Sequence, residues 1–430
     1  MRYLLVNHVP VGVGSAPGRV RVGDLWLEDL RAQGRAVAEH GGRVRVACPL
    51  VAELPRDSGS FHSVEVSLEQ EPFEHVALPA YRSLLQMLRV LGRVRRALRQ
   101  AMVEADIVQM GYGGHPVALG RVAWPIATTL GRPRVWVFDG ADPFPRLACE
   151  AAAALPGKRR VKHWAMRRFE AFCRRTVAEA ELVFAHNQAV VRRFADVWEE
   201  SRCHAFDRSF VTERWLVDEQ TLATREPHLR NGDRPLRLVA AGRQVAIKGT
   251  DQLIRAVALA RESGADVHLE VLGDGDDLPR FARLVEQLGL EQVVRFVGAV
   301  PFGQPLFDAW ARRDALVVTN LTDEISRNVL LALGRGLPLI TYRNPGTDAM
   351  LESADAAWLV PRGDSDALAD VLVQAHRRRD RLAALARHGL VLARQKSLEA
   401  THRQRAGLAA ACVQRPGAAR RDRTTANAAN

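Results

Sequence analysis

The chain has 430 residues, of which 47% are hydrophobic and 26% are charged. These values are average for a globular chain, so a largely disordered protein is excluded. No stretch reaches the ~18 uncharged apolar residues that a membrane-spanning helix needs. Lys and Arg number 61 against 49 Asp and Glu, a net charge of +12. Such an excess favours polyanionic partners, whether phosphorylated substrates, anionic lipid surfaces or nucleic acid.

The N-terminus and the cysteines carry no targeting or metal signal. The apolar run 3–6 is too short for a signal peptide, and Asn7 and His8 interrupt it. We interpret this run as a first strand and expect a cytoplasmic location. The five cysteines stand far apart, without a Cys-x-x-Cys spacing. Isolated buried thiols are therefore expected, rather than a disulfide framework or a structural zinc site.

In the first half of the chain, short β-branched runs alternate with segments of helical periodicity. This alternation is typical of parallel sheets with crossover helices. The predicted strands are Tyr3–Val6, Val44–Cys48, Ile107–Met110, Val135–Phe138 and Leu182–Ala185. Helices are predicted between them, for example at Leu25–His40 and Val117–Leu130.

The pattern degrades around 202–230, and turn residues follow at 231–235. A second series of strands is then predicted at Leu236–Ala240, Val267–Leu272, Val294–Val297, Ala315–Thr319 and Pro338–Tyr342, with helices such as Gly249–Arg261 and Leu278–Leu288. The class is therefore α/β, with two Rossmann-like halves. The predicted parts are an N-terminal domain 1–210, a linker 211–235, a C-terminal domain 236–392, a C-terminal crossover helix 393–414 and a disordered tail 415–430.

Ligands of open α/β sheets bind at the carboxyl ends of the strands, so the segments after the strands are candidate sites. The segment 241–250, Ala-Gly-Arg-Gln-Val-Ala-Ile-Lys-Gly-Thr, opens a predicted helix. Arg243 and Lys248 stand at its N-terminus, where the helix dipole and free amides favour an anion. It is not a Walker loop, because Ile247 precedes the lysine. A diphosphate site competes here with a solvated loop that carries ordinary surface cations.

Acidic residues follow two further strands. The Asp-x-Asp pattern at 274–276 could bind a divalent metal, but a tight turn with an aspartate capping the next helix explains it better. The segment 320–338 carries Asp323, Glu324 and Asn328 where a helix begins. Helix capping by Asp323 is the alternative explanation there.

Together these segments resemble the group 1 glycosyltransferases, the family 4 retaining enzymes of the GT-B fold. The order Gly-Arg…Lys-Gly, then strand-Gly-Asp-Gly, then Gly-Leu-Glu…Val-x-Phe-x-Gly at 289–298 carries the resemblance. Asn-Val-Leu-Leu at 328–331, Gly-Leu-Pro-Leu-Ile at 336–340 and Leu-Val-Pro-Arg-Gly-Asp at 359–364 continue it. It covers residue 236 to about 375, and only strand order supports it in the first half.

The resemblance implies two Rossmann-like domains with parallel sheets facing a central cleft, the C-terminal one holding a nucleotide sugar. Arg243 and Lys248 would clamp the donor diphosphate and stabilise it as the leaving group, so that no metal and no cofactor are required. Glu324 would be the catalytic residue that contacts the donor sugar. The other donor sugar or nucleotide contacts would be Asp323, Asn328, Val329 and Gly298.

One position departs from the family pattern. The family's second acid, which binds the nucleotide ribose, is expected eight positions after Glu324, where this chain has Ala332. Losing one ribose contact costs about 1–3 kcal/mol if the hydroxyls find no other partner. The departure either shifts the donor preference or marks a degenerate copy.

Candidates in the first half are looser. Val-Gly-Val-Gly-Ser at 11–15 follows the first strand, where family members bring a Gly-rich loop close to the diphosphate; Gly12 and Gly14 are the implied donor diphosphate contacts. A nicotinamide site is disfavoured, because no helix opens directly after this loop. The acceptor-side candidates are His115, Asp139 and Asp142. For His115, a histidine at a helix start without a functional role is an equal alternative.

Two segments concentrate the basic charge. Arg82–Arg99 carries six arginines and no acid, and 158–175 holds eight Lys/Arg against Glu170. Two amphipathic helices packing on the N-terminal sheet, with leucines at 84, 88, 91 and 98 on one side of the first, are one explanation. Docking on an anionic membrane is the other, and suits a lipid-linked acceptor. Nucleic-acid binding is disfavoured, since no nucleic-acid motif is present.

We therefore expect a cytoplasmic glycosyltransferase, peripheral at the inner face of the membrane if the basic helices dock there. It would move a sugar, with retention of configuration, from a nucleotide-sugar donor. The acceptor would be a glycan, a lipid-linked saccharide or a small molecule. The alternative is a catalytically silent sugar-nucleotide-binding subunit of a transferase complex.

Overall fold

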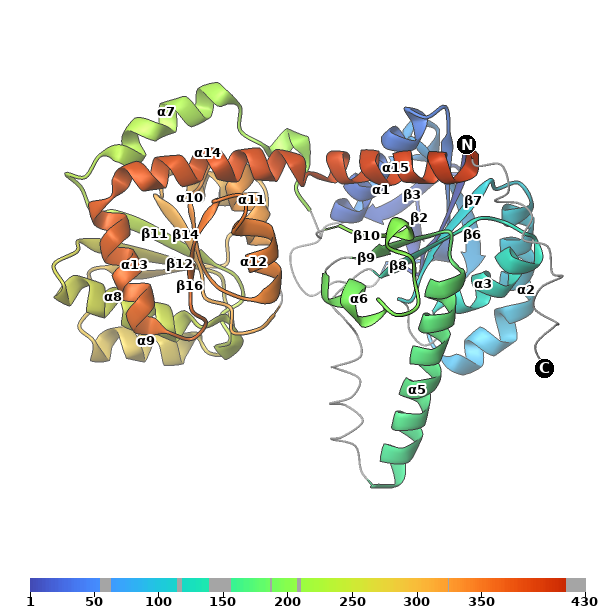
Figure 1. The fold of residues 1–430 in the computed structure, drawn as a ribbon, viewed down its shortest axis with the longest axis horizontal. Coiled ribbons are helices and arrows are strands. Elements are labelled where there is room, and N and C mark those ends of the chain that lie inside the picture. The colour runs from blue at the N-terminus through green and yellow to red at the C-terminus, as the bar shows by residue number, and fades with distance from the viewer. Residues whose placement is uncertain are drawn as a thin grey trace. The chain divides into compact units, whose positions relative to one another are not determined.

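The computed structural model describes residues 1–54, 63–113, 118–138, 156–185, 188–206, 210–323 and 325–414. The chain divides into two compact units, each built around its own sheet (Figure 1). Unit 1 comprises Met1–Arg208 and Thr401–Asn430, and unit 2 comprises Ser209–Ala400. The predicted α/β class is confirmed.

The strands described in unit 1 form one mixed sheet in the order β10-β9-β8-β7-β1-β4-β2-β3-β5, with β6 paired to β4. The strands are β1 Arg2–Val6, β2 Val11–Val13, β3 Arg19–Gly23, β4 Arg43–Val51, β5 Ser63–Ser67, β6 Phe73–Pro79, β7 Ile107–Gly111, β8 Arg134–Phe138, β9 Leu182–Ala185 and β10 Cys203–Ala205. The helices are α1 Asp24–Ala38, α2 Leu84–Val103, α3 Leu119–Thr129, α5 Pro156–Glu179, α6 Gln188–Arg193 and most of α15, Leu398–Gln414.

Helices cover both faces of this sheet. Successive side chains of a strand point to opposite faces. Leu4 and Val6 accordingly belong to one buried cluster, which contains residues of α2, α3, α5 and α6. Tyr3 and Leu5 belong to the other cluster, with residues of α1 and α15. Strands buried on both faces read as continuous apolar runs, which is why β1, β7, β8 and β9 are predictable from sequence.

Five strands escape prediction in this unit: β2, β3, β5, β6 and β10. The first two form an antiparallel pair in which Gly12 lies opposite Arg21 and Val13 opposite Val20. Polar residues alternate with apolar ones there, and glycines weaken the strand signal. Among the described cysteines, Cys48, Cys173 and Cys412 are buried and Cys203 is half-buried, and no disulfide joins these four. Burial raises the pKa of the Cys173 thiol to about 12, which leaves it protonated.

The leucine stripe predicted for the first basic segment is wrong at its start. In α2 the buried side chains are those of Met87, Val90, Val94 and Leu98. Leu84 and Leu88 are exposed instead. The stripe is shifted because Met87 and Val90 lie seven and four residues before Val94, so they share its face of the helix.

Unit 2 contains a fully parallel sheet in the order β13-β12-β11-β14-β15-β16. The strands are β11 Leu236–Ala241, β12 Val267–Leu272, β13 Val294–Gly298, β14 Ala315–Val318, β15 Leu339–Tyr342 and β16 Ala357–Val360. The helices are α7 Glu219–Arg230, α8 Thr250–Glu262, α9 Leu278–Gln287, α10 Gln304–Ala311, α11 Asn328–Gly334, α12 Pro345–Leu351, α13 Ser365–Arg377 and α14 Arg379–Gln395.

The strand order of this sheet reverses between β11 and β14. Numbered from β11, the order is 3-2-1-4-5-6, that of a doubly wound nucleotide-binding sheet. The crossovers leave β11 toward one side and β14 toward the other. Such folds bind their ligands outside the carboxyl ends of the two strands at which the order reverses.

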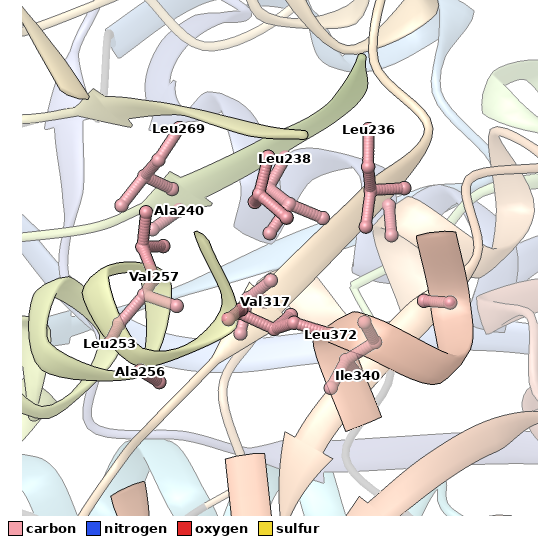
Figure 2. Packing of buried hydrophobic residues seen from close by; sticks show 14 of the residues in the cluster. Leu236, Leu238, Ala240, Leu253, Ala256, Val257, Leu269, Val317, Ile340 and Leu372 are labelled. Carbon is pink, nitrogen blue, oxygen red and sulfur yellow. The ribbon is translucent and has the colours of Figure 1, made fainter. Parts of the chain in front are cut away.

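The core of unit 2 holds this edge in place. One cluster joins Leu238 and Ala240 of β11 to Leu253 and Val257 of α8 (Figure 2). Because α8 is packed along the sheet in this way, its first turn is fixed beside the end of β11.

The segment 211–235, predicted as a linker, contains α7 and belongs to unit 2. Leu222 and Leu229 of α7 are buried, and the sequence hid this helix because Pro227 and charged residues interrupt its apolar spacing. A single helix was predicted for 393–414, whereas α14 ends at Gln395 and α15 begins at Leu398. The tail 415–430 lies outside the described residues.

Candidate functional site

Two loops meet at the reversal point of unit 2. The first, 242–250, follows β11 and contains a 3-10 turn, Ala246–Lys248, before α8. The second follows β14. The Thr319 hydroxyl donates to the Lys248 carbonyl at 2.9 Å, and the Leu321 amide donates to the Ile247 carbonyl at 2.9 Å. The carboxyl ends of both strands are thereby joined around the amino end of α8.

Gln244 organises the first loop from inside. Its side chain is buried, and Nε2 donates to the Gly242 carbonyl at 2.7 Å. Its Oε1 accepts from the Thr250 hydroxyl at 2.9 Å, which ties the loop to the first residue of α8. The backbone amide of Gln244 donates to the Asp274 carbonyl at 2.9 Å. No sequence signal separates this glutamine from a solvated one, so sequence reasoning missed it.

The loop after β12 packs against the same segment. A Cβ on Gly273 would lie 1.9 Å from the Gly242 oxygen, and one on Gly275 would lie 2.3 Å from the Gln244 oxygen. Asp277 accepts from the Ala246 amide at 2.6 Å and makes no side-chain cap bond to α9. The capping role predicted for this turn is therefore wrong, because the carboxylate serves the neighbouring loop.

Gly249 offers a test of how tightly the two loops meet. It is left-handed, with φ +66°, and a Cβ there would lie 2.3 Å from the Thr319 oxygen. Gly264 is also left-handed, φ +83°, but has open space around it. Gly264→Ala should cost only the left-handed strain, about 1–2 kcal/mol.

Gly249→Ala should lower the melting temperature further than Gly264→Ala, because the Thr319 carbonyl must also move. Thermal unfolding of the two variants side by side measures the difference. Equal melting temperatures would show that the loops are not in close contact.

The predicted donor contacts lie on these loops, at the start of α11 and at the end of β13. Arg243 is exposed and Lys248 is half-buried, five residues apart. The Asn328 side-chain amide donates to the Ala241 carbonyl at 2.8 Å, which links α11 to the end of β11. Val329 is fully buried in the core. Gly298 ends β13, and its carbonyl accepts from the Gly273 amide at 2.7 Å.

Of the two acidic candidates in the second loop, one lies among the described residues. Asp323 is exposed and pairs with Arg362 at 2.5 Å, and α11 begins only at Asn328, so Asp323 does not cap it. Glu324 lies outside the described residues. Its neighbour Ile325 packs against Gly346, where an added Cβ would lie 2.7 Å from it.

Asn320 is a further residue that sequence reasoning missed. It lies two residues after the end of β14, and its side chain is buried. Its amide nitrogen has no hydrogen-bond partner within the described part of the chain. A buried amide donor without a partner costs free energy, so a ligand that accepts its hydrogen bond would gain affinity.

The comparisons with known proteins match this part of the chain. A family model described as "Glycosyl transferases group 1" matches residues 235–378. The amylovoran biosynthesis glycosyltransferase AmsK of Erwinia amylovora is 25% identical over 147 residues, covering 33% of this chain and 36% of AmsK. The lipopolysaccharide core biosynthesis glycosyltransferase LpsE of Rhizobium meliloti is 29% identical over 142 residues, covering 33% and 39%.

The family match covers the sheet edge just described. The match to this family model covers residues 235–378, hereafter the group 1 domain. The chain spans little more than a third of the length of AmsK or LpsE. A likeness of fold extends over both units: HepE of Anabaena, crystallised with UDP, has a TM-score of 0.61 at 16% identity and covers 96% of this chain and all of its own. The predicted GT-B fold is confirmed.

Within the group 1 domain, Ala332 occupies a core position. It is fully buried on α11, in a cluster with residues of α10, α12, β14 and β15. Its methyl group therefore belongs to the packing of the domain. An acid at this position would have to displace core side chains to reach a ligand.

The first-half candidates lie in unit 1, apart from the group 1 domain in sequence. A Cβ on Gly14 would lie 2.5 Å from the Arg19 carbonyl, and one on Gly12 would lie 3.2 Å from the Arg21 Cβ. Close packing in the β2–β3 hairpin therefore accounts for both glycines. The acceptor-side candidates His115, Asp139 and Asp142 lie outside the described residues.

Two features are absent from the described residues. No group of three or more His, Cys, Asp or Glu side chains that could hold a metal ion occurs in the part of the chain that the structure describes. Over the same residues, no helix is both long and apolar enough to cross a membrane.

Proposed function

We propose that this chain is a glycosyltransferase that moves a sugar from a nucleotide-sugar donor held by unit 2. The observation that carries the proposal is the junction of the 242–250 loop with the segment after β14, at the reversal point of the sheet. The named activities of AmsK and LpsE support it, as does the UDP-glucose in a second HepE crystal structure.

The charges of the site suit a departing diphosphate. Arg243 and Lys248 supply two cations beside the amino end of α8, where the helix dipole also favours negative charge. As the bond from the anomeric carbon to the diphosphate lengthens, negative charge grows on the phosphate oxygens. Preorganised donors stabilise this charge without reorganisation. These residues would therefore make the diphosphate a better leaving group without requiring a metal.

The remaining residues have positioning roles in this proposal. The unpartnered Asn320 amide is available to a donor hydroxyl or phosphate oxygen. Glu324 would contact the donor sugar. Transfer with retention of configuration follows the resemblance to the family's retaining members, and the acceptor would be a glycan or a lipid-linked saccharide, as the names of AmsK and LpsE suggest.

A panel of nucleotide sugars tests the proposal, beginning with UDP-glucose. We expect one donor to release its nucleoside diphosphate faster in the presence of a saccharide or lipid-linked acceptor. Nuclear magnetic resonance of the product should show the donor's anomeric configuration. A protein that binds a nucleotide sugar but neither transfers nor hydrolyses it, across a broad acceptor set, would instead be the silent subunit.

A further inference from the structure

Both basic segments lie on the same face of the unit 1 sheet. Met87, Val90 and Val94 of α2 belong to the same buried cluster as Cys173 and Val177 of α5. The two helices thus use one side each to cover this face of the sheet. Their opposite sides point away from the sheet.

The outward side of α2 carries apolar as well as basic residues. Leu84, Leu85 and Leu88 are 56%, 70% and 59% exposed. Arg89 and Arg93 are exposed in the next turns. No acid occurs from Arg82 to Arg99. Three large exposed side chains within five residues form an apolar patch rather than the scattered single residues that are normal on a surface.

The amino-terminal half of α5 repeats this combination. Figure 1 shows α5 extending away from the sheet of its unit. Val161 and Trp164 are 63% and 64% exposed, whereas Phe172 packs against the buried cluster. The Arg168 guanidinium lies 5.7 Å from the centre of the Trp164 ring. The cations of this half are Lys158, Arg159, Arg160, Lys162, Arg167 and Arg168, and no acid lies among them.

We propose that these two outward sides, residues 82–99 of α2 and 158–168 of α5, form a docking surface for an anionic lipid bilayer. Exposure of Trp164 on α5 and of the three leucines on α2 is unfavourable in water, whereas such side chains are stabilised at the boundary between headgroups and acyl chains. The surrounding arginines and lysines would contact lipid phosphates, with their aliphatic stems along the apolar side chains.

A nucleic acid would account for the cations but not for the leucines. Bases stack on aromatic rings, and phosphates pair with cations; exposed aliphatic side chains contribute to neither contact. Trp164 stands alone among the aliphatic residues of this surface, without the aromatic series that single strands use. The docking surface belongs to unit 1 and holds whether or not unit 2 transfers a sugar.

Co-sedimentation of the full chain with vesicles tests the docking surface without donor or acceptor. Phosphatidylcholine vesicles with and without phosphatidylglycerol should differ, with binding to the anionic vesicles alone and weaker binding at high salt. Replacing Arg89, Arg93 and Arg96 by Gln should lower the partition constant on the order of 100-fold, since each cation contributes about fivefold. Arg255, Arg283 and Arg295 are exposed on unit 2, and their Gln triple variant is the charge-matched control.

The apolar contribution is measured separately. Replacing Leu84, Leu85, Leu88 and Trp164 by Ser should release the protein from anionic vesicles, whereas Leu288→Ser and Val391→Ser on unit 2 should not. Tryptophan emission should shift to shorter wavelength on binding, and Trp164→Phe should remove the shift while binding persists.

Three results would overturn the proposal. The first is equal recovery with neutral and anionic vesicles. The second is wild-type binding by the Leu/Trp variant, which would show that no side chain inserts. The third is retention of duplex DNA or RNA at salt concentrations where anionic vesicles are not bound.

Discussion

Glu324→Gln is expected to lower sugar transfer by about 10²–10³, the loss that follows removal of one preorganised polar group at a reacting centre. The substitution keeps the size and removes the negative charge that would stabilise the anomeric carbon as its bond to the diphosphate lengthens. Affinity for the nucleoside diphosphate should change little, because Arg243 and Lys248, rather than Glu324, are the proposed diphosphate contacts. A fall in turnover with unchanged nucleotide affinity is the signature of an interaction made in the transition state.

Asp323→Asn is the matched control for this variant. It removes a neighbouring charge, but the Asp323 carboxylate is exposed and pairs with Arg362, and exposed ion pairs contribute little. Steady-state turnover of both variants with a common donor tests whether Glu324 has a catalytic role. If Glu324→Gln and Asp323→Asn retained equal, near wild-type turnover, Glu324 would have no catalytic role.

Ala332→Glu is expected to destabilise unit 2 by several kcal/mol rather than to restore a ribose contact. The methyl group of Ala332 is fully buried among apolar residues. An uncompensated charge in such a place costs about 3–5 kcal/mol, a large part of the stability of a domain. Overpacking adds to the loss.

The charge can be separated from the volume. Ala332→Gln introduces the same size without ionising, so its unfolding should be less affected than that of the Glu variant at neutral pH. The buried carboxyl of the Glu variant would have a pKa above its unfolded value of about 4.3. Its destabilisation should therefore grow as pH rises above that value and shrink toward pH 4. A Glu variant as stable as the wild type, with tighter UDP binding, would show that position 332 opens to the donor.

The sequence predicts the fold well where strands are buried on both faces. The run Leu182–Ala185 is β9 with its predicted bounds, because all of its residues are apolar and buried. The hairpin of β2 and β3 contains no continuous apolar run, since arginines and glycines occupy half of its positions, and it is therefore not predicted. Helix α7 is hidden because Leu222 and Leu229 are isolated apolar residues in a charged segment.

The sequence predicts the position of the candidate site, but it does not predict the hydrogen bonds that hold the loops of the site together. The place of Arg243 and Lys248 after β11 follows from the alternation of strands and helices. The role of Gln244 depends on partners 2 and 6 residues away and on the next loop, and no local pattern encodes that combination. Asp277 shows the same limit: its carboxylate bonds the amide of Ala246, 31 residues earlier, instead of its own helix.

The central claim is that the loop after β11 holds the donor diphosphate. Calorimetry of UDP binding to Arg243→Ala and Lys248→Ala tests it most directly, with Arg255→Ala, an exposed arginine of the adjoining helix, as the control. Charge-assisted hydrogen bonds contribute about 1.5–3 kcal/mol each, so each site variant should bind at least tenfold more weakly while melting like the wild type. Unchanged UDP affinity in both site variants would contradict the account.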